Sequence, residues 1–242
     1  MKLLGHSSAK TQKGEAIGYL TGILYLAPHA LSGAGNVCPW AASCKTGCLN
    51  SSGRGAFSNV QKARIAKTRF FFSNRDAFLE TLFEDCKSLI TKAKRLGLLP
   101  CIRLNGTSDL AFHRLIVPSQ NKTLMQCFPS VPFYDYTKSV KKALDNAKGL
   151  HAPNYTVVFS RDSQSNETEC HQVLSAGGNV AVVFRDSLPS TYWHRPVLNG
   201  DATDLRFLDR RARAGRHGYV VGLKAKGQAK RDQSGFVVDA SN

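Results

Sequence analysis

Short apolar runs alternate with amphipathic segments through the second half of the chain. The sequence predicts helices over residues 139–149 and 166–178, between runs of high β propensity. Strands that alternate with helices usually pair in parallel through right-handed crossovers. The predicted fold class is therefore α/β, either a partial parallel β/α barrel or an open parallel sheet. The predicted strands are residues 99–104, 132–137, 155–160, 179–184 and 218–223.

The first half of the chain follows a different pattern. Residues 16–30 form an apolar segment interrupted by two glycines, which predicts a strand or hairpin leading into a loop. That loop, residues 32–57, is dense in Gly, Ser and Asn and contains three cysteines. We expect a basic helix to follow, with Ser58 as its cap and Gln61 closing a capping box.

A second helix is predicted to begin near Asn74. Its apolar side chains recur at helical spacing and form one stripe, which is typical of a helix packed on a core. Cys86 lies within this stripe, so we expect a buried thiol there. The same role is expected of Cys101, Cys127 and Cys170, with the fourth ligand of a metal centre as the alternative.

Basic residues outnumber acidic residues by 33 to 17, which gives a formal net charge of +16. A charge of this size favours an anionic ligand or partner, and nucleic acid is the commonest large polyanion. A generally basic protein with solvated charged faces is the alternative. The residues expected to contact nucleic acid are Lys62, Lys67, Arg69, Arg210, Arg211 and Arg213.

The chain has the length of one domain, so we predict a single domain over residues 1–242 with the cysteine loop at 32–57. Residues 226–242 are predicted to form a basic, mobile tail. The sequence contains no signal-peptide pattern and no run of about 20 apolar residues. It therefore predicts a cytoplasmic protein without a membrane partner.

Four of the predicted strands are followed directly by a cationic residue: Lys138, Arg161, Arg185 and Lys224. The first three are 23 and 24 residues apart, about one strand and one helix each. We expect them side by side at the carboxyl edge of the sheet, where parallel α/β proteins bind ligands. There they would hold anionic groups of a ligand. The alternative is that charged residues simply end strands at the surface.

The cysteine loop places Cys38, Cys44 and Cys48 in the pattern C-x5-C-x3-C. Seven cysteines, an odd number, in an intracellular chain of this length argue against disulfides. Zinc favours closer pairs and four ligands, whereas an iron-sulfur cluster accepts wider spacing because its irons are spread over several ångströms. A cluster is the first interpretation, zinc the less favoured metal, and free thiols the third. Three thiolates would leave one iron of a four-iron cluster open to a ligand.

Six motifs occur in a fixed order along the chain. The longest is TGILYLAPHALSGAGNVCPWAASCKTGCLNSSGRGAFSNVQKARIAKT, followed by RLNGTSDL, FYDYTKS, VVFSRDS, DATDLRFLD and VGLKAKGQAK. Over residues 14–238 this set resembles a phage-encoded, cysteine-rich gene-product family of unassigned function. That family is distantly similar to radical S-adenosylmethionine (SAM) iron-sulfur proteins, although its cysteine gaps are wider than their C-x3-C-x2-C.

The resemblance implies a [4Fe-4S] cluster on Cys38, Cys44 and Cys48 at the mouth of a partial barrel, with SAM as a ligand of the open iron. It also implies a location in the host cytoplasm. From the residues themselves, the polar group that follows the strand at 99–104 is expected to bind a ligand or to cap the next helix. Its members are Asn105, Thr107 and Asp109.

Two functions follow from these observations. The first is an iron-sulfur redox enzyme, radical SAM-like or of another kind. The alternative is a nucleic-acid-binding or host-directed phage protein whose cluster is structural or a sensor. A third possibility combines them, as a cluster enzyme that modifies a nucleic acid or nucleotide.

Overall fold

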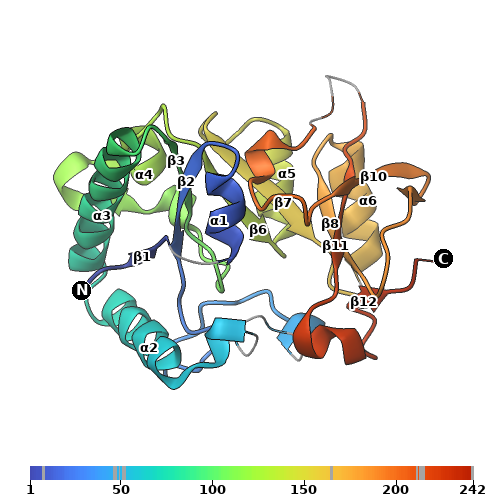
Figure 1. The fold of residues 1–242 in the computed structure, drawn as a ribbon, viewed down its shortest axis with the longest axis horizontal. Coiled ribbons are helices and arrows are strands. Elements are labelled where there is room, and N and C mark those ends of the chain that lie inside the picture. The colour runs from blue at the N-terminus through green and yellow to red at the C-terminus, as the bar shows by residue number, and fades with distance from the viewer. Residues whose placement is uncertain are drawn as a thin grey trace.

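The computed structural model describes residues 1–6, 9–45, 48, 50, 53–163, 166–210, 212 and 216–240, apart from the side chains of residues 9 and 10. A ten-stranded sheet crosses the molecule in the order β1-β2-β3-β6-β7-β8-β11-β10-β9, with β12 beside β8 (Figure 1). Its strands are β1 (Leu4–Gly5), β2 (Tyr19–Leu24), β3 (Leu99–Arg103), β6 (Phe133–Thr137), β7 (Tyr155–Ser160), β8 (Val180–Phe184), β9 (Thr191–Tyr192), β10 (Arg195–Asn199), β11 (Val220–Lys224) and β12 (Val237–Val238).

The pairing within this sheet is mostly parallel. From β2 to β10 every neighbouring pair is parallel, while β1 and β9 add antiparallel strands at the two ends. Over the described residues the path does not close on itself. The predicted α/β class is therefore confirmed in its open-sheet form, and the sheet is not a closed barrel.

The alternating half of the chain folds as its pattern predicts. The five predicted strands are β3, β6, β7, β8 and β11, each within two residues of the expected bounds. The two helices predicted between them are α5 (Val140–Ala147) and α6 (Glu167–Ser175). Local periodicity was sufficient here because each run is largely apolar, and all but β3 are rich in β-branched or aromatic residues.

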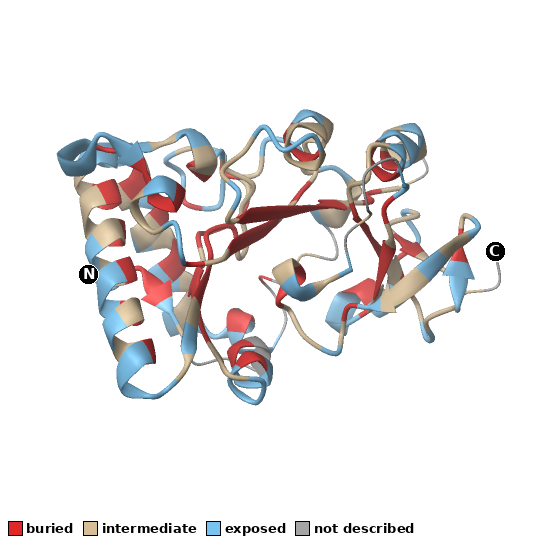
Figure 2. Ribbon diagram, turned by 90° about the horizontal axis from the view of Figure 1, so that it is seen from above, coloured by how far each residue is buried: buried red, intermediate tan, exposed pale blue. Residues whose placement is uncertain are grey.

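The two faces of the sheet are covered differently. Helices α3 (Arg75–Arg95), α5 and α6 pack on one face, over strands that Figure 2 shows as largely buried. On the other face, Leu205 packs with Cys101 and Tyr134, and α1 (Ala9–Glu15) lies against β2. Successive strand residues point to opposite faces, so Cys101 and Ile102 belong to different clusters.

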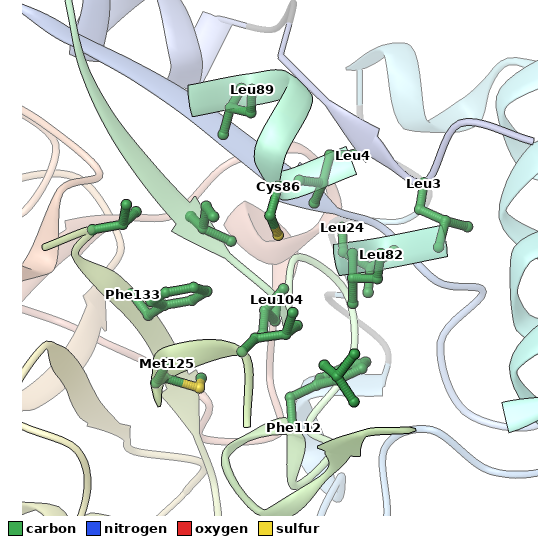
Figure 3. Packing of buried hydrophobic residues seen from close by; sticks show 14 of the residues in the cluster. Leu3, Leu4, Leu24, Leu82, Cys86, Leu89, Leu104, Phe112, Met125 and Phe133 are labelled. Carbon is green, nitrogen blue, oxygen red and sulfur yellow. The ribbon is translucent and has the colours of Figure 1, made fainter. Parts of the chain in front are cut away.

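The apolar stripe of α3 is confirmed. The Asn74 side chain accepts a hydrogen bond from the Ala77 N–H at 3.0 Å, and the helix begins there. Cys86 is fully buried among leucines, as expected for a core thiol (Figure 3). Deleting one such buried leucine costs about 2–5 kcal/mol, so this stripe is a main source of stability.

The start of α2 (Ser58–Ser73) differs from the prediction. Phe57 occupies the N-cap without a side-chain hydrogen bond, so the predicted capping box of Ser58 and Gln61 is wrong. The Gln61 amide instead donates to the carbonyl oxygens of Asn50 at 2.8 Å and Gly55 at 2.5 Å. Gln61 therefore ties the end of the cysteine loop to the helix rather than capping the helix.

The C-terminal segment is packed through residue 240 in the part of the chain that is described. β7 and β8 pair only near residues 159–160 and 180–181, and β12 then pairs with Val183 and Phe184 at the carboxyl end of β8. The segment predicted as a mobile tail thus contributes a strand and η8 (Gly227–Arg231). The single-domain organisation stays a prediction.

Short elements complete the described chain. They are β4 (Ile116–Val117), β5 (Lys122–Thr123), α4 (Leu124–Cys127), η1 (Ser43–Lys45), η3 (Gly53–Ala56), η4 (Phe112–Arg114), η5 (Pro118–Gln120) and η7 (Arg206–Leu208). Among the helices formed by the described residues, none is long and apolar enough to cross a membrane.

Candidate functional site

A cavity of about 550 Å³ lies at the carboxyl ends of the central strands. Cys38, Cys44 and Cys48 all line it, from the loop that follows β2. The remaining walls come mainly from strand ends and the turns after them, including Arg103, Tyr136, Ser160, Val183 and Leu223. This is the edge where parallel sheets bind ligands, and the volume suits a small organic molecule.

The cysteine loop is fastened to this edge through Asp162, which follows β7. The Asp162 carboxylate accepts hydrogen bonds from the N–H groups of Ser43 at 3.0 Å and Cys44 at 3.2 Å. The Lys138 ammonium lies 3.1 Å from the same carboxylate, and both side chains are nearly buried. Burial alone would raise the pKa of Asp162, but Lys138 and the two N–H donors lower it overall. The residue is therefore a charged anchor of the loop.

A second attachment lies on the β3 side of the cavity. The Asp109 N–H donates to the Val37 carbonyl oxygen at 2.8 Å. The Cys38 thiol donates to the carbonyl oxygen of Thr107 at 3.5 Å. The loop is thus held to the polar turn after β3 at one side and to the turn after β7 at the other, which fixes its first two cysteines over the sheet edge.

The thiols lie close enough to influence one another's ionisation. Burial raises the pKa of Cys38 to about 11, and negative charge at Cys48, Cys44 and Asp109 acts in the same direction. Burial also raises the pKa of Cys44, against the positive charge of Lys138. Without a metal these two thiols are therefore protonated at neutral pH. A metal that binds them must displace the protons.

His29 lines the same cavity and is under local strain. Its backbone adopts φ 53°, in the left-handed region that few residues other than Gly, Asn, Asp and His enter. Both ring nitrogens are buried and have no hydrogen-bond partner among the described residues. Burial lowers the pKa of His29, and the positive charge of Lys45 lowers it further, so the imidazole is neutral. A neutral imidazole beside three thiols adds a fourth donor of the kind that binds metals.

These donors share a cavity without converging on one point. Across the described residues, no group of three or more His, Cys, Asp or Glu side chains is arranged to hold a single metal ion. None of the seven cysteines, all of them described, forms a disulfide.

A separate wall of the cavity is built around Asp201, which follows β10. We call Lys13, Asp201, Lys224 and Lys226 the lysine wall. The Lys226 ammonium lies 2.5 Å from the Asp201 carboxylate, and the Lys224 N–H donates to that carboxylate at 2.8 Å. Lys13, from the last turn of α1, donates to the Asp201 carbonyl oxygen. Burial would raise the pKa of Asp201, but these donors and charges lower it overall.

Comparison with known proteins adds one finding to this geometry. The family model described as Gene product 88 matches residues 2–240, nearly the whole chain. The chain belongs to the Gene product 88 family. This is a phage family, as the motif resemblance predicted. No curated protein and no solved structure matches the chain significantly.

In this Gene product 88 chain the polar turn after β3 is occupied by internal hydrogen bonds. Asn105 exchanges hydrogen bonds with Asp135, Ser108 and Leu110. The Asp109 carboxylate accepts from the Thr137 hydroxyl and the Lys138 N–H, and it lies 3.3 Å from the Lys142 ammonium. The Thr107 hydroxyl donates to the Leu26 carbonyl oxygen at 2.5 Å. The three residues of this turn that were predicted to bind a ligand all line the cavity, and their side chains form part of its wall.

The four predicted cations divide into two pairs. Lys138 and Lys224 line the cavity of the Gene product 88 chain. Arg161 is buried, donates to the Gly235 carbonyl oxygen at 2.7 Å and pairs with Glu167. Arg185 pairs with Asp239 at 2.7 Å and donates to backbone carbonyls of the C-terminal segment. These two arginines fasten β12 beside β8, a role that the sequence did not reveal because it depends on contacts across 45 to 74 residues.

Only some of the residues predicted to contact nucleic acid are exposed to solvent in the described part of the chain. Lys62, Arg69 and Arg210 are exposed, whereas Lys67 is half-buried and donates to the Leu3 carbonyl oxygen. Arg211 and Arg213 lie outside the described residues. Arg64 of the same basic helix is buried and donates to the Asn50 side chain. Burial lowers the pKa of Arg64, while nearby Tyr25 and Cys48 act in the opposite direction. This basic helix therefore faces the cysteine loop as well as solvent.

Sequence reasoning missed four residues of the site, which are His29, Asp162, Lys13 and Lys226. Asp162 stands in the motif VVFSRDS directly after Arg161, the residue that was predicted to bind a ligand. Lys13 and Lys226 lie more than 200 residues apart, and nothing in the local pattern links them. A signal for Asp162 was available, since it follows a predicted strand at the carboxyl edge.

Proposed function

We propose that this phage protein is an iron-sulfur protein in which Cys38, Cys44 and Cys48 hold a [4Fe-4S] cluster and leave one iron open to a ligand in the cavity. The observation that carries the proposal is the convergence of three thiols from one loop on one cavity at the carboxyl edge of the sheet. When bound, such a cluster supplies one-electron redox chemistry.

The donor set fits a cluster better than a single zinc ion. Zinc requires four donors at about 2.0–2.3 Å from one point. The described cysteines line one cavity without forming such a group. A four-iron cluster receives each thiolate on a different iron, so its ligands need not meet at a point. Zinc is therefore the less favoured metal of the two.

Two cations near the cysteines partly offset the burial that disfavours the thiolate form a cluster requires. Lys138 lowers the pKa of Cys44, although burial outweighs it and the net shift is upward. Arg64 lies near Cys48, since Cys48 affects the pKa of the Arg64 guanidinium. Positive groups near cluster sulfurs stabilise the charge of the bound centre. Metal binding and proton release are coupled at this site, so assembly should be more complete at higher pH.

Iron and acid-labile sulfide counts on anaerobically reconstituted protein test the proposal. We expect about four irons and four sulfides per chain, and loss of most of both in Cys44→Ala. Cys127→Ala is the matched control, because Cys127 is also half-buried but lies outside the cavity. A colourless protein that retains zinc, or equal iron in both variants, would contradict the proposal.

SAM is one ligand to test, because the motif resemblance implies it. Adding SAM to the reduced, reconstituted protein should change the electron paramagnetic resonance spectrum of an open-site cluster. An unchanged spectrum together with absence of SAM cleavage would remove the radical SAM version and leave the cluster intact.

Nucleic-acid binding is the second candidate, favoured by the net charge of +16. Lys62 and Arg69 of α2 and Arg210 offer exposed cations for phosphates. If this surface binds nucleic acid, the affinity for a single-stranded oligonucleotide should fall steeply as salt rises, and Lys62→Met should reduce the slope by about one. An affinity that does not change with salt would contradict it.

A further inference from the structure

We infer that the lysine wall binds the phosphate group of a small organic phosphate monoester, whose organic part occupies the rest of the cavity. This site shares the cavity of the proposed function but uses none of the cysteines. It therefore does not depend on whether a cluster is bound.

The lysine wall is assembled from three separate parts of the chain. Lys13 comes from α1, Asp201 from the turn after β10, and Lys224 and Lys226 from the end of β11 and the segment after it. Asp201 gathers them through its carbonyl oxygen and its carboxylate. Each lysine is exposed and lines the cavity, so its ammonium group is accessible to a ligand.

The charges of this wall do not cancel. Three lysines face one carboxylate, which leaves an excess of two positive charges. Lys226 is paired with Asp201, and Lys13 contacts only a carbonyl oxygen of that residue. The Lys224 ammonium has no partner among the described residues. Lys13 and Lys224 therefore carry the unbalanced charge.

The neighbouring acidic group does not neutralise this excess. Asp204 also lines the cavity, but it is paired with Arg103 at 2.8 Å and both side chains are nearly buried. The pair of Arg103 and Asp204 is neutral, so it leaves the excess positive charge of the lysine wall unchanged. An arriving anion would thus meet Lys13 and Lys224 rather than a carboxylate.

An excess of two charges matches a phosphate monoester more closely than other common anions. A phosphate monoester carries about −1.5 to −2 charges at pH 7, whereas a carboxylate or a sulfate ester carries one. Lysine binds phosphate as a point charge, without the bidentate geometry that arginine imposes. The adjacent side chains Val183, Leu223 and Phe236 are apolar and suit an organic group rather than free phosphate.

Isothermal titration of the full chain with phenyl phosphate, phenyl sulfate and inorganic phosphate tests the inference. Phenyl phosphate should bind more tightly than phenyl sulfate, which has the same shape and one charge fewer. It should also bind more tightly than inorganic phosphate, which lacks the organic part. Lys13→Met and Lys224→Met should each weaken phenyl phosphate binding by about tenfold.

Lys94→Met serves as the matched control, because Lys94 is an exposed lysine of α3 outside the cavity. Phosphorus-31 resonance shifts of the bound ligand give a second readout that a change in folding alone would not reproduce. Equal affinity for the phosphate and the sulfate, equal loss in the control, or no binding at millimolar ligand would each overturn the inference. Binding of phenyl phosphate by protein that contains no iron would support this inference. The absence of iron would then count against the proposed cluster alone.

Discussion

The cysteine loop and the lysine wall border the same cavity but are built in opposite ways. The charges that anchor the loop to the sheet edge are nearly buried and compensated, as in the pair of Lys138 and Asp162. In the lysine wall, the ammonium groups are exposed and exceed the carboxylate. Buried, compensated charges fix a structure, whereas exposed, unbalanced charges attract a partner and are screened by salt. The two proposals make the same distinction, with a permanent group at the cysteines and an exchangeable ligand at the lysines.

The largest expected difference concerns the two anchoring aspartates. Asp162→Asn leaves Lys138 buried without its counter-charge, so the free energy of unfolding should fall by about 3 kcal/mol. Asp201→Asn affects exposed lysines, so the loss should stay below about 1 kcal/mol. Urea unfolding of both variants measures the contrast. Equal losses in the free energy of unfolding would show that the two aspartates contribute equally to stability, and would contradict this contrast.

The reactivity of Cys38 toward alkylation gives the next largest effect. Its pKa of about 11 means that the thiol is protonated at neutral pH, and the thiolate fraction rises about tenfold per pH unit until that value is approached. In the metal-free protein, alkylation of Cys38 by iodoacetamide should therefore accelerate steeply from pH 7 to pH 10. Peptide mass spectrometry follows the residue. A rate that is already maximal at pH 8 would mean that the loop does not bury this thiol.

A smaller effect is expected at His29, on the cysteine side of the cavity. Glycine adopts φ 53° without the steric cost that His29 bears. His29→Gly should therefore increase the free energy of unfolding of the metal-free protein by about 1 kcal/mol. A glycine at His194, which also has positive φ at 56°, provides the comparison outside the cavity. If only the His194 variant is stabilised, His29 makes contacts that offset its strain.

The smallest expected difference between the cysteine loop and the lysine wall lies in how salt affects ligand binding and iron content. Raising ionic strength from 0.05 to about 0.2 M should weaken phenyl phosphate binding several-fold, because exposed charges are screened over about a Debye length. The iron content of reconstituted protein should not change over the same range. Titrations and iron counts at both salt concentrations check this. A salt-insensitive phosphate affinity would place the ligand in a buried site.

The sequence was informative wherever function follows the local pattern. The strands β3, β6, β7, β8 and β11 were predicted from apolar runs, and the polar residues after them do lie along one edge. The cysteine loop was located from its composition, and its three thiols do line that edge.

What the sequence could not supply depends on contacts between distant segments. Arg161 and Arg185 look like ligand-binding residues, yet they fasten β12, which enters the sheet because β7 and β8 diverge. Lys13 joins the lysine wall only because α1 lies on the face of the sheet that also carries the turn at Asp201. Gln61 fits a capping box by spacing, but its hydrogen bonds go to the cysteine loop. In each case a tertiary contact overrides a locally plausible role.

Mössbauer spectroscopy of the protein reconstituted with isotopically enriched iron tests the central claim most directly. Three thiolates on a four-iron cluster leave one iron chemically distinct, so two iron environments are expected in a ratio of about three to one once a ligand occupies the cavity. Cys38→Ala, Cys44→Ala and Cys48→Ala should each abolish this signal, and Cys127→Ala should preserve it. Four equivalent irons, or a signal that survives loss of any of the three cysteines, would contradict the account.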